Sequence, residues 1–102
     1  MNQKQREAAR AALLAHAAME TTKGRHFDFM QMLETRKKNY NLQPSELESA
    51  LLAELLADHD AAVAAFRTES ASLREADSDA FTALFAHITA FEQALAPIRE
   101  GQ

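Results

Sequence analysis

Four histidines are the residues of this chain with the most versatile chemistry, because imidazole binds metals and transfers protons near neutral pH. They are His16, His26, His59 and His87. A metal site in a helical bundle requires ligands one turn apart, as in a Glu-x-x-His or His-x-x-x-His pair. None of the four has a glutamate three residues before it, and no two of them are four residues apart. We therefore expect no metal ion and no cofactor.

His59 differs from the other histidines because it interrupts an apolar stripe between Leu55 and Ala62. Asp58 and Asp60 flank it, but adjacent residues of a helix point about 100° apart and do not bind one ion together. Buried polar groups are usually hydrogen-bonded. We therefore expect His59 to be half-buried and hydrogen-bonded to a neighbour, with pH-sensitive packing as the alternative.

The residue types needed for catalysis are scarce. There is no cysteine, which excludes a thiolate nucleophile. The two glycines, Gly24 and Gly101, are too few and too far apart for a loop that cradles phosphate. Serines fall at expected helix caps or in polar stretches, and paired carboxylates such as Glu54 and Asp58 are typical of a solvated helix face. We expect the protein not to be an enzyme.

Two groups of residues have the composition of a surface that binds a macromolecule. The first, here called the aromatic face, lies on the expected last helix and consists of Phe81, Phe85, Ile88, Phe91 and Leu95. The second, here called the basic run, consists of Arg36, Lys37 and Lys38. Aromatic and arginine side chains are enriched at the centres of protein interfaces. These eight residues are the candidate partner interface.

The charge distribution bears on the kind of partner. Residues 1–40 contain eight Lys and Arg against four Asp and Glu, whereas residues 41–102 contain three against eleven. A basic segment over 23–38 with nearby aromatic residues could bind nucleic acid, but a net charge of −4 opposes attraction to phosphates. We expect the basic segment to pair instead with acidic helix surface, either residues 46–60 of this chain or a partner.

Composition predicts an all-α fold. The chain has 22 alanines, the residue of highest helix propensity, but only one valine and two isoleucines, which favour strands. Two glycines and two prolines are too few to punctuate a sheet of short strands. At 102 residues we expect a single domain over 1–102, with frayed ends at about 1–3 and 97–102.

The N-terminal 40 residues are predicted to form two helices. The first covers residues 3–23, and Gly24 has the conformational freedom that commonly ends a helix. Asp28 begins a capping-box sequence, which predicts a second helix over 28–39. The alternative is one kinked helix over 3–39, because glycine costs a helix interior only about 1 kcal/mol.

The segment 41–44 is the clearest loop, because Pro44 disfavours helix at the residue before it. Ser45 and Glu48 then form a capping box that begins a long helix over about 45–74.

The last predicted helix covers about 79–96. Asp77 or Ser78 caps its N-terminus and Pro97 ends it.

The spacing of apolar residues predicts how the helices pack. The expected packing positions of the first helix are Leu13, Leu14, Ala17 and Met19. The long helix has a stripe at alternate steps of three and four, typical of side-by-side packing, at Leu52, Leu55, His59, Ala62, Phe66, Glu69 and Leu73. Further apolar residues widen this stripe and predict more than one neighbour: Leu47, Leu51, Leu56 and Val63. We therefore predict an antiparallel bundle of four helices, or three if 3–39 is continuous.

By exclusion, the expected function is a small non-enzymatic protein–protein interaction module, acting as an adaptor, regulator or inhibitor through its helix faces. Two apolar helix faces predict a homodimer. The alternative is an accessory protein that binds nucleic acid through residues 23–38. No apolar run is long enough to cross a membrane, and the first ten residues are polar, so we expect no membrane partner and a cytoplasmic location.

Overall fold

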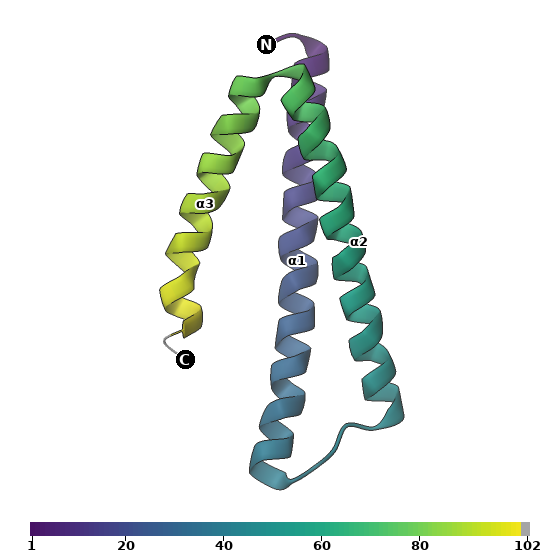
Figure 1. Cartoon of the computed structure of the whole chain (residues 1–102). Helices are drawn as coiled ribbons and strands as arrows, with labels where there is room; N and C mark the ends of the chain where they lie inside the picture. Colours follow the sequence, from purple (N-terminus) through teal and green to yellow (C-terminus); the bar gives the residue numbers. More distant parts are fainter. Residues whose placement is uncertain (101–102) are drawn as a thin grey trace. The chain divides into compact units, whose positions relative to one another are not determined.

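The computed structural model describes residues 1–100, with side chains through Ala96, and consists of three α-helices (Figure 1). α1 covers Gln3–Tyr40, α2 covers Glu46–Ala76 and α3 covers Ser78–Glu100. These residues contain no strand, so the all-α prediction is confirmed. No helix among them is long and apolar enough to span a membrane. The predicted frayed end falls partly on residues 101–102, which lie outside the described part of the chain.

The chain divides into two compact units whose boundaries fall inside helices. The first unit consists of Met1–Ala12 and Glu69–Gln102, and therefore combines the start of α1, the end of α2 and all of α3. The second unit, Leu13–Thr68, contains the rest of α1, the loop after it and most of α2. A single domain over 1–102 stays a prediction.

The second unit is an antiparallel pair of helices. The rings of His16 and Phe66 lie 5.5 Å apart. Thr22 Oγ1 lies 3.1 Å from His59 Nδ1. Closer to the loop, Arg36 on α1 pairs with a glutamate in the first turn of α2. In these contacts, residues later in α1 pair with residues earlier in α2, which is the pattern of an antiparallel helical hairpin.

α1 is continuous through Gly24, so the expected break at 24–27 is wrong and the three-helix alternative is correct. Gly24 does not have the positive φ of a helix-ending glycine. The reason lies in a stripe of buried or half-buried residues at steps of three and four on both sides of the glycine: Ala15, Met19, Thr22, His26, Phe29 and Leu33. Packing of this stripe outweighs the cost of about 1 kcal/mol for one helical glycine.

The same stripe corrects the packing predicted for the start of α1. Leu13 and Leu14 are 53% and 60% exposed, and Ala17 is exposed too, whereas Met19 is half-buried as expected. Ala12 and Ala15 belong to the stripe, and adjacent residues of a helix point about 100° apart. The two leucines therefore point away from the packed side of the helix.

The stripe predicted for α2 is confirmed, since each of its seven residues is buried or half-buried. The prediction that four further apolar residues widen this stripe is wrong at three of the four positions. Leu47, Leu51 and Leu56 are exposed, and Leu47 is 84% exposed, while Val63 is half-buried. One neighbouring helix covers a narrow stripe of heptad spacing, and residues beside that stripe stay in solvent.

Two predicted helix caps are confirmed. Ser45 Oγ accepts a hydrogen bond from the Glu48 N–H at 3.2 Å, and Glu48 Oε1 accepts one from the Ser45 N–H at 3.0 Å, which is a complete capping box. Asp77 Oδ1 accepts from the Ala80 N–H at 3.1 Å and caps α3. These side chains satisfy backbone donors that a helix start leaves unpaired.

Two further observations concern where α1 and α3 end. α1 ends at Tyr40. The next residue, Asn41, has a φ of 54° in the left-handed region, and its N–H donates to Lys37 O at 2.9 Å. The prediction that Pro97 ends the last helix is wrong, because α3 continues to Glu100. A proline so near a helix end withholds only one backbone hydrogen bond.

The first unit has a small core. Ala12, Ser70, Leu73 and Leu84 are buried, with Leu73 only 1% exposed. Gln5 Nε2 donates to Ala76 O at 3.1 Å and so joins the start of α1 to the end of α2. This core positions the start of α3, on which the aromatic face begins.

Candidate functional site

The aromatic face lies on α3 in the first unit, and its first members contact each other. The Phe81 and Phe85 rings are 4.7 Å apart with their planes 39° apart, which is a tilted aromatic pair. The Arg74 guanidinium lies 5.7 Å from the Phe81 ring centre, within the range of a cation–π contact. These contacts hold Phe81 against its own chain.

Two of the five residues of the aromatic face are nevertheless exposed to solvent. Leu84 is the residue of α3 that enters the core, while Phe85 and Phe91 are each 41% exposed. Phe81, Ile88 and Leu95 are half-buried. An exposed phenylalanine costs the free energy of hydrating its apolar surface, about 25 cal/mol per Å². Whether a partner covers these two phenylalanine side chains stays a prediction.

The basic run lies in the second unit, at the end of α1. The eight candidate residues are therefore divided between the two units. Lys37 and Lys38 are exposed. Arg36 is half-buried and forms an ion pair with Glu48, with 2.7 Å between Nη2 and Oε1.

This ion pair shifts the pKa of both partners. The hydrogen bond from Arg36 lowers the pKa of Glu48 to about 2, and the Ser45 N–H adds to the effect. The hydrogen bond with Glu48 in turn raises the pKa of Arg36. At neutral pH both groups are charged, so part of the basic run is neutralised by the 46–60 segment, as expected from the charge distribution.

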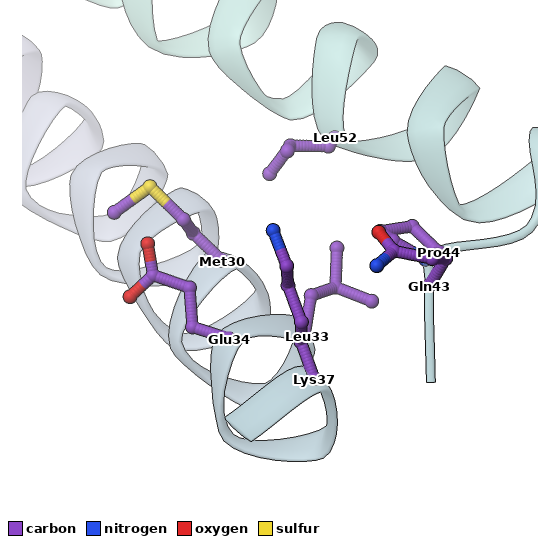
Figure 2. Close-up of a pocket in the computed structure, with 7 residues that line it drawn as sticks. All are labelled: Met30, Leu33, Glu34, Lys37, Gln43, Pro44 and Leu52. Atoms are coloured by element: carbon purple, nitrogen blue, oxygen red, sulfur yellow. The ribbon is translucent and has the colours of Figure 1, made fainter. Parts of the chain in front are cut away.

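A pocket opens beside the basic run, between the ends of α1 and α2 and the loop that joins them. It has a volume of about 420 Å³. Figure 2 shows the lining residues, which are Met30, Leu33, Glu34, Lys37, Gln43, Pro44 and Leu52. The Lys37 side chain extends toward the middle of this group, facing Leu52, and the Glu34 carboxylate lies on the Met30 side (Figure 2).

Apolar side chains line this pocket together with one ammonium group, one carboxylate and one amide, from Lys37, Glu34 and Gln43. Among the residues that the structure describes, none forms an ion pair with Lys37. The formal charges of Lys37 and Glu34 therefore cancel in the lining of the pocket. Sequence reasoning did not find the pocket, although Leu33 and Leu52 mark where the stripes of α1 and α2 approach the loop.

His59 is placed as expected. It is half-buried, and its Nδ1 lies 3.1 Å from Thr22 Oγ1. That hydroxyl also lies 3.0 Å from Met19 O and 3.1 Å from Ala18 O. A hydroxyl that donates to a carbonyl accepts from the imidazole N–H, so the predicted hydrogen bond of His59 is confirmed.

His16 makes a different contact. Its ring packs against Phe66, and its Nε2 lies 3.8 Å from Glu20 Oε1, too far for a hydrogen bond. Within residues 1–96 no three His, Cys, Asp or Glu side chains lie close enough to hold a metal ion. The chain matches no known protein family, no curated protein and no solved structure.

Proposed function

We propose that this chain is a non-enzymatic protein–protein interaction module that acts as an adaptor, regulator or inhibitor through its helix faces. One observation carries the proposal: among the described residues, five hydrophobic side chains are buried and twelve large ones are exposed. Contiguous exposed apolar surface on a small protein commonly marks a site of interaction. A two-helix hairpin buries one stripe per helix and leaves the remainder for a partner.

The aromatic face is the surface that we assign to the partner. Phe85 and Phe91 are the exposed aromatic side chains of α3, and buried aromatic anchors dominate the binding energy of protein interfaces. A homodimer follows as a proposal, since a second copy carries the same uncovered face. A cytoplasmic location stays a prediction.

Binding to nucleic acid through residues 23–38 is the alternative proposal. Its support is the exposure of Lys37 and Lys38. The pairing of Arg36 with Glu48 weakens it, because a paired guanidinium attracts phosphate less.

The proposed function is tested by replacing both anchors, Phe85→Asp and Phe91→Asp, and comparing proteins captured from the native host. The matched control is Leu51→Asp, which changes an equally exposed apolar residue outside the aromatic face. We expect the double variant to lose specific partners that the control retains, with both keeping the helical circular dichroism of the wild type. Equal capture by both variants would remove the aromatic face from the proposal.

A further inference from the structure

A second stripe, here called the exposed stripe, runs along one side of α2. Its members follow each other at alternate steps of four and three and are all exposed: Leu47, Leu51, Glu54, Asp58, Ala61 and Ala65. From Leu51 onward, each member directly precedes a residue of the buried stripe. Adjacent residues of a helix point about 100° apart. The exposed stripe is therefore a continuous side of α2 that α1 leaves uncovered.

The N-terminal part of α2 carries charge of one sign. Residues 46–66 contain five carboxylates and no lysine or arginine. Arg36 neutralises one of the carboxylates, that of Glu48. The other four are exposed and form no ion pair within the described part of the chain: Glu46, Glu54, Asp58 and Asp60. The leucines of the exposed stripe therefore adjoin negative charge that this chain does not balance.

We propose that the exposed stripe binds a basic amphipathic α-helix of a partner protein. Apolar side chains of that helix cover Leu47 and Leu51, which are 84% and 41% exposed. Lysine or arginine side chains of the same helix pair with Glu54 and Asp58. The surface belongs to the second unit and shares no residue with the aromatic face, so this inference goes beyond the proposed function and does not depend on it.

The spacing of the exposed stripe favours a helical occupant over an extended one. Alternate steps of three and four are the spacing at which two helices pack side by side. From Leu47 to Ala65 the stripe rises about 27 Å, or about five turns. The small side chains of Ala61 and Ala65 allow a close approach, because the distance between two helix axes depends on the side chains at their contact. An amphipathic helix of similar length therefore matches the stripe along its whole course.

The unpaired carboxylates determine the charge of the partner and the behaviour of the complex. Opposite charges across an interface steer two proteins together, whereas like charges oppose binding. A contact along one helix lies at the small end of specific interfaces. We therefore expect a Kd in about the micromolar range, which rises with salt concentration because exposed charges are screened.

The test uses the full chain and a synthetic helical peptide of leucine, lysine and alanine, about five turns long. Its leucines and lysines are spaced to oppose the leucines and carboxylates of the exposed stripe. The matched peptide has glutamate at every lysine position. Calorimetry should show at least about tenfold weaker binding of the glutamate peptide than of the lysine peptide. Equal binding of the two peptides, or no binding of the lysine peptide, would overturn the proposal.

Paired variants of α2 test where the lysine peptide binds. Leu51→Ser with Asp58→Asn changes the exposed stripe. Leu56→Ser with Asp60→Asn makes the same changes at exposed residues on another side of the helix. We expect the first pair to raise the Kd at least about tenfold and the second to change it by less than about twofold. Circular dichroism establishes that each variant is folded. Equal effects of the two pairs would mean that the peptide binds the whole acidic helix, and would overturn the exposed stripe.

The two surfaces of this chain are tested separately. The double variant Phe85→Asp with Phe91→Asp should bind the lysine peptide as the wild type does. Leu51→Asp should weaken binding of the lysine peptide and still retain the partners of the aromatic face, for which it is the control. Failure of either surface therefore leaves the other standing. Loss of peptide binding in the double variant would place the peptide on the aromatic face and would overturn this proposal.

Discussion

Arg36 Nη2 lies 2.7 Å from Glu48 Oε1, and this ion pair joins α1, near its C-terminal end, to the first turn of α2. The same carboxylate oxygen accepts the Ser45 N–H that begins α2. One side chain therefore caps a helix and fastens it to its neighbour. The contact spans the loop of residues 41–45, which lies outside both helices.

The stability contributed by Glu48 should depend on pH. Its pKa falls from 4.5 to about 2 on folding, so its stabilising contribution is complete above pH 4.5 and is lost as the pH falls toward 2. Thermal melts of Glu48→Gln and wild type should therefore differ most above pH 4.5 and converge near pH 2. Glu54→Gln, an exposed acid on the same helix, is the control and should differ little from wild type at neutral pH. A Glu48 difference that is independent of pH would mean that the ion pair contributes nothing.

Gly24→Ala should stabilise the protein. Gly24 is inside α1 and its φ is not positive. Apart from its chain neighbours and the adjacent backbone of its own helix, no part of the chain lies within 4 Å of the position that an alanine Cβ would occupy. Alanine in a helix interior is favoured over glycine by about 0.5–1 kcal/mol. Unfolding in denaturant should show this gain in the free energy of unfolding, with an unchanged dependence of that free energy on denaturant concentration. A loss of stability would indicate that the chain breaks at Gly24 after all.

His59→Leu should change the free energy of unfolding by less than about 1 kcal/mol. Leucine fits the apolar stripe, and Thr22 keeps carbonyl partners within its own helix. Chemical unfolding of the variant measures the effect. A double-mutant cycle with Thr22→Val and the double variant isolates the interaction between the two side chains. A loss above about 2 kcal/mol would show that His59 belongs to a larger hydrogen-bond network.

Nucleic acid should bind this protein only weakly. Arg36 is paired and eleven carboxylates follow residue 41, so we expect a Kd no tighter than about millimolar near physiological salt. Fluorescence anisotropy with labelled duplex and single-stranded oligonucleotides measures this. The nucleic-acid alternative would be favoured by a submicromolar Kd that rises with salt concentration. In that case the Kd of the double variant Lys37→Gln/Lys38→Gln should depend less steeply on salt.

The sequence by itself determined the helical class, the stripe of α2 and two helix starts. These features depend on interactions over only a few residues, so they do not require knowledge of the rest of the fold. They are the alanine content, the spacing of apolar residues by three and four, and the capping pairs Ser45–Glu48 and Asp77–Ala80. The half-buried position of His59 followed from the same spacing.

Tertiary structure decided the continuity of α1, the exposure of Leu13, Leu14 and Leu47, and the pocket beside the loop. Gly24 permits either a helix end or a helix interior at a cost of about 1 kcal/mol, and packing against α2 makes the choice. Apolar residues on two sides of a helix compete for one neighbour. Which side is covered depends on where that neighbour lies, and this information is not contained in the spacing of residues along one helix.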